Sequence, residues 1–220
     1  MKPRILLSDL FSTLVPGGDA ERDVVNLAMS ELLGVDPDAF TREFEAASYE
    51  RFIGAYGDLP NTIRVIAGRC GVTPNDDQVQ QATNLRRALS RRLLEAVPPG
   101  TLNTLATFKA AGWRTGLVSN TTSETQAQWS GSPLEPYFDT TAFSAELGAA
   151  KPDPKIYLTA CNALNVVPTD CVYVADGRDN ELQAAAALGM HVIRTTEHSD
   201  SDPTWPGLSI TTYAELTNLL

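Results

Sequence analysis

Polar side chains stand at four places where apolar runs of this sequence stop. They are Asp9 with Thr13, Ser119 with Asn120, Lys151 in the stretch "GAAKPDP", and Asp176 in the stretch "VYVADGRDNE". Taken singly, each has an ordinary structural explanation, such as a helix cap, a solvated charge or a turn. Together they supply a nucleophile, a hydroxyl donor, a cation and a second carboxylate, and this set suits displacement at a phosphoryl group.

Each member of this set has a distinct chemical task. The Asp9 carboxylate can attack phosphorus and form an aspartyl-phosphate, which splits one difficult step into two easier ones. Asp9 and Asp176, at separate strand ends, can hold Mg²⁺, an oxygen-seeking ion that usually keeps water and substrate phosphate as its other ligands. Lys151 would offset charge on the transferring group and Ser119 would donate a hydrogen bond to it. We therefore expect a small anionic substrate and Mg²⁺ as cofactor.

These residues need a scaffold that brings the ends of separate strands together. Apolar runs predict strands at 4–8, 114–120, 140–143, 171–176 and 191–195, and helix-period segments predict helices at 101–112, 154–165, 180–189 and 212–220. This alternation predicts an α/β fold, a Rossmann-like doubly wound parallel sheet with helices on both faces. Ligands of such sheets bind beyond the carboxyl ends of the strands, where the four polar sites would meet.

A helical unit interrupts this alternation. Residues 19–95 carry helix-period apolar positions and proline-marked breaks, with little that is typical of strands. We therefore expect a Rossmann-like core from residues 1–18 and 96–220, with a helical subdomain over 19–95 inserted after the first strand. Its candidate substrate contacts are Arg22, Arg42, Tyr49, Arg51, Tyr56 and Arg64. For any one of them a solvated helix face is the more ordinary explanation.

The composition excludes several classes of partner. The chain has 220 residues, of which 43% are hydrophobic and 20% charged, as in ordinary soluble globular proteins. Its formal net charge of -10 argues against nucleic acid and anionic membranes, because the field would repel phosphate. Three cysteines without CxxC spacing favour buried reduced thiols in a cytoplasmic protein over a zinc site or a disulfide framework. No apolar run is typical of a signal peptide or a membrane span, and we expect a monomer or homodimer.

The motifs, taken in order, resemble those of the haloacid dehalogenase-like (HAD) hydrolase superfamily over nearly the whole chain. "DLFSTL" is similar to its first motif, "LVSN" to its second, "SAELGAAKPDPKIY" to its third and "VYVADGRDNELQAAAALGM" to its fourth. Any one of these is a weak signal, but four in order, with a helical insertion between the first and second, are a strong one. The resemblance implies a Rossmann-like core and a small helical cap that closes over the site.

The resemblance also implies roles for individual residues. Asp9 would be the nucleophile, and Lys151 would steady both it and the phosphoryl oxygens. The residues expected around the transferring group and substrate are Thr13, Ser119, Asn120 and Ser12. The metal would be held by Asp9, Asp176, the backbone carbonyl of Phe11, and Glu181 through a bound water, with Asp179 competing for that last role. Ser12 replaces the family's usual glycine, and we expect no harm, because serine is small and the turn need not demand a positive φ.

Phe11 departs from the pattern of the family's phosphatases. They usually carry a second aspartate there, a general acid and base whose absence removes roughly 10²- to 10⁴-fold in rate. An aromatic residue at this position is a feature of 2-haloacid dehalogenases, which expel a good leaving group without a metal and generally lack the acidic fourth motif. Phosphonate-cleaving members also lack the second aspartate but depend on a cap lysine, and residues 19–95 contain no lysine.

The fourth motif decides between these alternatives at this stage. The chain keeps Asp176 and Glu181, and a dehalogenase gains nothing from crowded carboxylates near an anionic substrate unless a cation compensates. We therefore expect a Mg²⁺-dependent phosphatase-type hydrolase of a small phosphorylated metabolite. A metal-independent 2-haloacid dehalogenase and a catalytically weak binding protein with the same fold are the alternatives.

Overall fold

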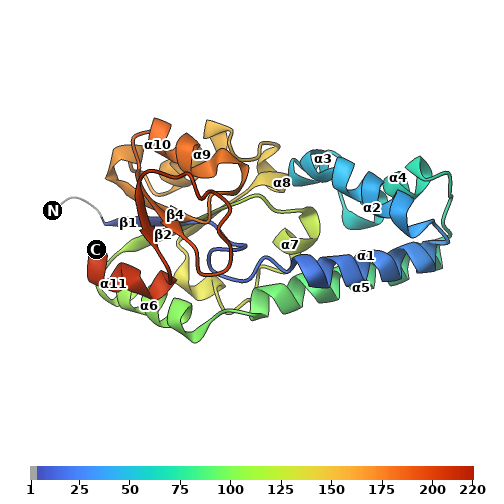
Figure 1. The fold of residues 1–220 in the computed structure, drawn as a ribbon, viewed down its shortest axis with the longest axis horizontal. Coiled ribbons are helices and arrows are strands. Elements are labelled where there is room, and N and C mark those ends of the chain that lie inside the picture. Colours follow the sequence, from blue (N-terminus) through green and yellow to red (C-terminus); the bar gives the residue numbers. More distant parts are fainter. Residues whose placement is uncertain (1–3) are drawn as a thin grey trace.

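The computed structural model describes residues 4–220, which form a six-stranded sheet covered by helices, with a further group of helices to one side (Figure 1). Residues 1–3 of the predicted core lie outside the described residues. The strands are β1 (Ile5–Ser8), β2 (Arg114–Ser119), β3 (Thr140–Phe143), β4 (Cys171–Ala175), β5 (His191–Thr195) and β6 (Leu208–Ile210). They lie in the order β3-β2-β1-β4-β5-β6 and all neighbouring pairs are parallel. The predicted Rossmann-like α/β fold is confirmed.

The central strands are buried on both faces, which explains their nearly unbroken apolar sequences. Every residue of β1 and β4 is buried, and side chains alternate between the two faces of the sheet. Leu6 packs into the hydrophobic cluster on one face, which includes Leu105 of α6 (Pro99–Ala110). Leu7 packs into the opposite cluster with Tyr157 of α9 (Pro154–Ala163) and Leu182 of α10 (Glu181–Ala187).

The strand order reverses at β1, and this reversal creates the place for a site. β1 pairs with β2 on one side and with β4 on the other, so the loops that follow these three strands diverge at their carboxyl ends. The loops after β2 and β3 each contain a short helix. These helices are α7 (Ser123–Ala127) after β2 and α8 (Ser144–Leu147) after β3. Lys151 therefore does not end a strand as predicted, because α8 and a loop separate it from β3.

Residues 19–95 form five helices with a hydrophobic cluster of their own. They are α1 (Asp19–Leu33), α2 (Pro37–Ala46), α3 (Ser48–Phe52), α4 (Leu59–Arg69) and α5 (Asp76–Glu95). The proline-marked breaks hold helix caps, because the side chains of Asp36, Asp58 and Asn75 accept backbone N–H bonds at the starts of α2, α4 and α5. The long helices α1 and α5 lie side by side (Figure 1). The predicted helices are present, and their action as a cap stays a prediction.

The C-terminal part differs from its prediction in two ways. The sequence analysis missed β6, a three-residue edge strand whose Leu208 is exposed and so lacks an apolar pattern. The predicted helix at 212–220 is a 3₁₀ turn (Tyr213–Glu215) followed by the four-residue α11 (Leu216–Leu219). Tyr213 is buried, and its hydroxyl lies 2.7 Å from Ser8 Oγ, so this segment is anchored to β1. Among residues 4–220 we find no helix with the length and apolar character needed to cross a membrane.

Candidate active site

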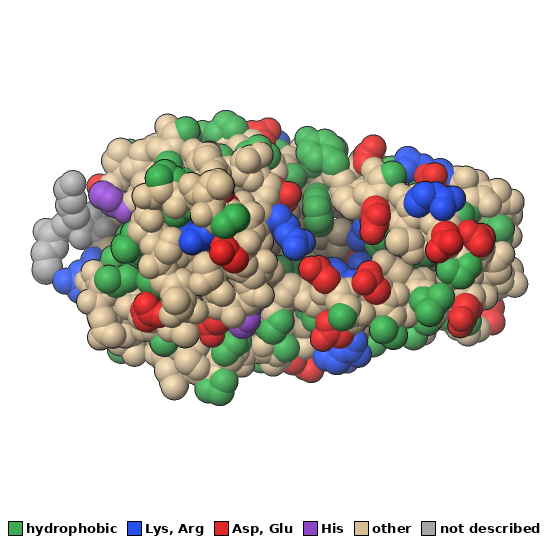
Figure 2. Space-filling model, viewed as in Figure 1, with side chains coloured by type: hydrophobic (Ala, Val, Ile, Leu, Met, Phe, Trp, Pro, Cys, Tyr) green, Lys and Arg blue, Asp and Glu red, His purple; other side chains and the backbone are tan. Residues whose placement is uncertain are grey.

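The carboxyl ends of β1, β2 and β4 open into a cavity of about 500 Å³ that also borders helices of the 19–95 segment. Figure 2 shows the hollow between the two parts, with basic side chains inside it and acidic ones at its rim. Eight of the predicted site residues line it: Asp9, Phe11, Ser12, Ser119, Asn120, Lys151, Asp176 and Glu181. The ninth, Thr13, lies behind Asp9 and donates a hydrogen bond to Asp9 Oδ2 at 3.2 Å. The structure therefore brings all nine together.

Lys151 is the only cation paired with the buried carboxylates among the described residues of this end of the cavity. Its Nζ lies 2.5 Å from Asp9 Oδ1 and 2.5 Å from Glu181 Oε2, and all three residues are buried. Burial alone would lower the pKa of Lys151, but Asp9 and Glu181 outweigh it and raise the pKa above its usual value. Lys151 is therefore a permanent positive charge beside Asp9.

Asn120 positions Lys151 through its backbone. The side-chain oxygen of Asn120 accepts a 2.7 Å bond from Lys151 N, and its amide nitrogen donates to Lys151 O at 3.3 Å. The same nitrogen donates to Asp179 Oδ2 at 3.0 Å. Asn120 was predicted near the substrate, and in the structure its amide fixes the loop that presents the lysine.

Three carboxylates gather around this lysine, and we call them the carboxylate cluster: Asp9, Asp176 and Glu181. One oxygen of each lies within 4.8 Å of the others. Burial, reinforced by Asp176, raises the pKa of Asp9, although Lys151 opposes this. Burial, together with Asp9 and Asp176, likewise raises the pKa of Glu181 to about 8 against the effect of Lys151. When all three are ionised, Lys151 balances one charge and two remain, so a divalent cation fits this donor set.

Further hydrogen bonds hold the members of the carboxylate cluster in place. Glu181 Oε1 accepts from Gly177 N at 3.0 Å, and Oε2 accepts from Tyr173 Oη at 2.7 Å in addition to Lys151. Ser201 Oγ donates to Asp176 Oδ2. Both Glu181 oxygens are thus engaged, which suits the predicted indirect role through water. Asp179, the competing candidate, is bonded to Asn120 and is not one of the three clustered carboxylates.

Ser119 offers a free hydroxyl at the end of β2. Its Oγ is buried and has no hydrogen-bond partner among residues 4–220, yet the residue lines the cavity. Buried hydroxyls are normally paired, so an unpaired one in a cavity wall is a candidate ligand contact. This geometry suits the predicted donation to the transferring group.

The turn after Asp9 corrects one expectation. Ser12 adopts φ 60, so the prediction that this turn needs no positive φ is wrong. Only glycine takes that conformation without a steric cost, which explains why a glycine is the simpler choice there. Leu14 N and Val15 N both donate to Leu10 O, and these two bonds close the turn and fix the backbone of Ser12.

Phe11 connects the two parts of the molecule. Its half-buried ring packs against the hydrophobic cluster beneath the sheet and also against the cluster of helices α1–α5. The guanidinium carbon of Arg22 lies 4.7 Å from the ring centroid, within the range of a cation–π contact. The ring thus lies in the cavity wall and offers no acidic proton there.

A second charged group lies at the other end of the cavity, and we call it the arginine cluster: Arg22, Arg51 and Arg86. Of the six candidates predicted in the 19–95 segment, Arg22 and Arg51 line the cavity. The four candidates that do not line it are Arg42, Tyr49, Tyr56 and Arg64. Arg64, for instance, is paired on the surface with Asp76 at 2.7 Å.

Sequence reasoning missed Arg86 and its partner Glu124. Arg86 Nη2 lies 3.0 Å from Glu124 Oε1, and the side chains are only 2% and 3% exposed. The sequence did contain a signal for Arg86, because this residue falls between Thr83 and Leu89 on the buried face of α5. A charged residue on an apolar helix face calls for a buried partner.

Comparison with known proteins identifies the family. A model of the haloacid dehalogenase-like hydrolases matches residues 3–189. The chain belongs to this family. A glyceraldehyde 3-phosphate phosphatase of Methanopyrus kandleri is 27% identical to this HAD-like hydrolase over 210 residues, covering 91% of this chain and 88% of the relative. An (S)-2-haloacid dehalogenase 4A of Burkholderia cepacia is 31% identical over 115 residues, covering 50% of this chain and 49% of the relative.

Solved structures agree on the fold. A HAD phosphatase from Thermococcus onnurineus superposes with a TM-score of 0.69 at 22% identity, covering 98% of this chain and 97% of the other. A 2-haloacid dehalogenase from Pseudomonas syringae pv. tomato superposes with a TM-score of 0.71 at 18% identity, covering 99% and 97%. Both kinds of enzyme therefore share the fold of this HAD-like hydrolase, and the choice between them rests on the site.

Proposed function

We propose that this HAD-like hydrolase is a Mg²⁺-dependent phosphatase that hydrolyses a small phosphorylated metabolite through an aspartyl-phosphate at Asp9. The observation that carries the proposal is the carboxylate cluster, in which three buried carboxyl groups gather around the single cation Lys151. A metal-independent enzyme for an anionic substrate would be hindered by such a cluster, whereas a metal-dependent phosphatase requires it.

The residues of the chain divide the work of the first chemical step. Asp9 attacks phosphorus, its new O–P bond forms as the bond to the ester oxygen breaks, and water later cleaves the aspartyl-phosphate. Lys151 favours the ionised form of Asp9 and offsets charge on the phosphoryl oxygens, and Ser119 donates its free hydroxyl to one of them. Asp9, Asp176 and the backbone carbonyl of Phe11 would hold Mg²⁺, with Glu181 acting through a water, and the ion would supply further charge neutralisation.

The leaving oxygen departs without a carboxylic acid at position 11. Phe11 has no proton to give, so leaving groups that are stable as anions are favoured over alkoxides. We regard the site as altered in its preference and not as inactive, because the nucleophile, the lysine and the acidic cluster are all assembled.

The 19–95 segment acts in this proposal as a cap on a core made of residues 1–18 and 96–220. Side chains from α1, α2, α3 and α5 line the cavity opposite the strand ends, so they can exclude water and contact the substrate. Three free cysteines suit a reducing compartment such as the cytoplasm.

The decisive experiment measures phosphate release with and without metal. Hydrolysis of p-nitrophenyl phosphate should vanish with a chelator, return with Mg²⁺, and be lost in Asp176→Asn but not in Asp38→Asn, an exposed carboxylate on α2. Phosphate release that a chelator leaves unchanged would contradict the proposal.

A second candidate is a 2-haloacid dehalogenase, favoured by Phe11 and by the partial similarity to such an enzyme. It predicts chloride release from 2-chloropropionate that a chelator leaves unchanged, with no phosphate release. Absence of both activities would favour a binding protein.

A further inference from the structure

We infer that the arginine cluster binds a second anionic group on the substrate, at the end of the cavity opposite Asp9. The substrate class is then a phosphate monoester that carries a carboxylate or a second phosphate a few bonds away from the ester. This inference rests on the proposed phosphatase function and adds the identity of its substrate class.

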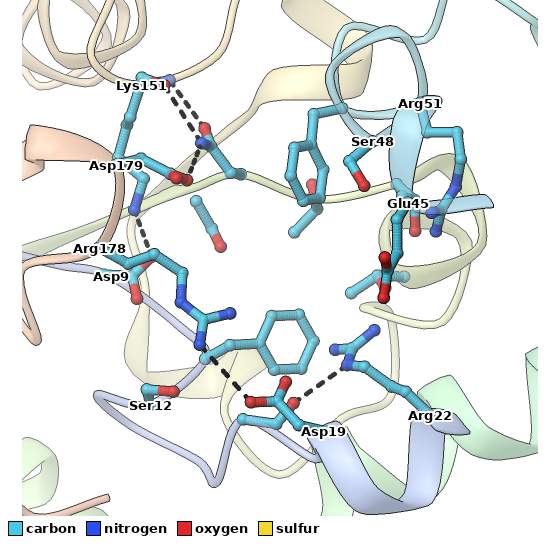
Figure 3. A pocket seen from close by; sticks show the side chains of 18 of the residues that line it. Asp9, Ser12, Asp19, Arg22, Glu45, Ser48, Arg51, Lys151, Arg178 and Asp179 are labelled. Carbon is cyan, nitrogen blue, oxygen red and sulfur yellow. Dashed lines mark hydrogen bonds and ion pairs between the residues drawn. The ribbon is translucent and has the colours of Figure 1, made fainter. Parts of the chain in front are cut away.

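The two charged groups face each other across one space. Figure 3 shows Arg22 and Arg51 on the side of the cavity opposite Asp9 and Lys151. They come from α1 and α3, whereas Arg86 comes from α5, so three separate helices deliver positive charge to the same end. A cavity of about 500 Å³ is much larger than one phosphate needs and suits a small metabolite that spans both ends.

The arginine cluster has more charge than its surroundings balance. Glu124 forms its direct ion pair with Arg86, and neither Arg22 nor Arg51 forms an ion pair with any residue of 4–220. Three further carboxylates line the cavity: Asp19, which is paired with Arg178 at 3.5 Å and also acts on Arg22, and Asp23 and Glu45, which are exposed. Burial lowers the pKa of Arg51 to about 9 and that of Arg22 to about 10, with Glu124 only partly opposing the effect. An anion between them would offset this excess.

The guanidinium groups are held in place while most of their donors stay free. Arg51 lies 3.8 Å from the centroid of the Phe44 ring and donates to Phe44 O at 3.2 Å. Arg22 stacks on Phe11 and donates to Gly17 O at 3.0 Å. Each guanidinium has five N–H donors in its plane, and stacking on a ring leaves that plane open to carboxylate or phosphate oxygens.

Arg86 adds an independent observation at the same end. It is 2% exposed, and its Nε has no hydrogen-bond partner within residues 4–220, although Nη1 and Nη2 are bonded to Asn26 and Glu124. A buried unpaired donor in a cavity wall is costly unless a ligand satisfies it. The same arginine lies 5.0 Å from the centroid of the Phe44 ring, next to the ring that supports Arg51.

The test compares substrates that differ only at the distal end. They are 3-phosphoglycerate with a carboxylate, glycerol 1,3-bisphosphate with a second phosphate, and glycerol 3-phosphate with a neutral hydroxyl. We expect kcat/KM for at least one doubly anionic substrate to exceed that for glycerol 3-phosphate by about tenfold or more. The preferred member of the pair identifies the second group as carboxylate or phosphate.

Variants of the arginine cluster test whether it causes the preference for doubly anionic substrates. Arg51→Gln should lower kcat/KM for the preferred substrate about 10- to 100-fold more than for glycerol 3-phosphate, mainly through KM, and Arg22→Gln should act in the same direction. The matched control is Arg42→Gln, an exposed arginine on α2 that does not line the cavity and should leave the ratio unchanged. Thermal melts establish that each variant folds, and either variant suffices if the other does not.

The outcomes separate this inference from the proposed function. If Mg²⁺-dependent hydrolysis is present but all three substrates react alike, or if Arg51→Gln and Arg22→Gln reduce all of them equally, the inference is wrong and the phosphatase stands. If no phosphate ester is hydrolysed, the proposed function is wrong, and calorimetric titration of the same three compounds decides the inference. Roughly tenfold tighter binding of a doubly anionic compound, lost in Arg51→Gln, would support it, and equal binding would overturn it.

Discussion

The two ends of the cavity follow the same electrostatic rule with opposite signs. At one end three carboxylates surround one lysine, and at the other three guanidiniums share one buried carboxylate. Both groups are largely removed from water, where an unbalanced charge is expensive. The comparison teaches that the two proposals are complementary: a cation would balance one end, and an anion would balance the other. A substrate with an anionic group at each end would join them.

The largest expected effect comes from removing the nucleophile from the carboxylate cluster. Asp9→Asn should lower kcat by at least about 10³-fold, because an amide cannot form the aspartyl-phosphate. The thermal melt should change little, because relief of the cost of burying the Asp9 carboxylate and of its repulsion with Asp176 offsets the lost pairing with Lys151. Asp38→Asn, far from the cavity, is the control for a lost carboxylate. Turnover retained in the Asp9 variant would end its assignment as nucleophile.

The next largest effect is on stability at low pH and comes from Glu124, the one carboxylate paired within the arginine cluster. Burial alone would raise the pKa of Glu124, but Arg86 and Arg51 outweigh it and lower the pKa to about 2. The folded state therefore holds this proton less tightly than the unfolded state. Its stabilising contribution, on the order of 3 kcal/mol, is present above about pH 4.5 and is lost as the pH falls toward 2.

Glu124→Gln isolates that contribution. Chemical denaturation should show the variant less stable than the parent near pH 7, with the difference shrinking steadily between pH 4.5 and 2. The exposed Glu21→Gln on α1 is the control and should show no such trend. A difference that stays constant with pH would mean that Glu124 is not held ionised by the arginine cluster.

Addition of Mg²⁺ tests the excess of negative charge that the proposal assigns to the carboxylate cluster. Mg²⁺ at 100 times its dissociation constant should add about 2.7 kcal/mol to the free energy of unfolding, seen as a rise of several degrees in Tm. Asp176→Asn should remove most of that rise, and Asp179→Asn should retain it, because Asp179 is outside the carboxylate cluster. Equal losses in both variants would contradict the assignment of the metal to that cluster.

The smallest expected effect is a change in kcat on replacing Phe11, which lies between the two ends of the cavity. Phe11→Asp should raise kcat on alkyl phosphates about tenfold more than on aryl phosphates, because only alkoxides need the new acid. A carboxyl group without optimised geometry realises only part of the usual gain of roughly 10²- to 10⁴-fold.

Phe11→Asn controls for the loss of packing, since the ring contacts both hydrophobic clusters and its removal lowers stability whatever replaces it. Equal effects of Phe11→Asp on both kinds of substrate, in a folded protein, would mean that another group supplies the acid or that the chemistry is not phosphoryl transfer.

The end of the cavity that holds the carboxylate cluster could be predicted from the sequence because local patterns define it. Asp9, Ser119 and Asp176 stand where fully buried strands stop, and parallel strands gather such residues at one edge of the sheet. The predicted strands and the order of the four motifs were therefore enough to predict that all nine candidate residues lie around one cavity.

The arginine end could be predicted only in part: Arg22 and Arg51 were candidate substrate contacts, whereas the buried pair of Arg86 and Glu124 depends on tertiary contacts. Arg86 and Glu124 lie 38 residues apart on helices from different parts of the fold, and no local pattern pairs them. Likewise the φ of Ser12 is set by the closed turn around it, and β6 is an edge strand with too few buried residues to leave a pattern.

The Arg86–Glu124 pair also bears on how fast product can leave. Arg86 belongs to α5 of the 19–95 segment and Glu124 to α7 after β2, so opening the cavity at this contact would separate them. Separation gives up the pairing that lowers the pKa of Glu124, a free energy on the order of 3 kcal/mol that already allows for the hydration the carboxylate regains. The pair would thus align the two parts when closed and slow their reopening, so product release would depend on a contact outside the reacting groups.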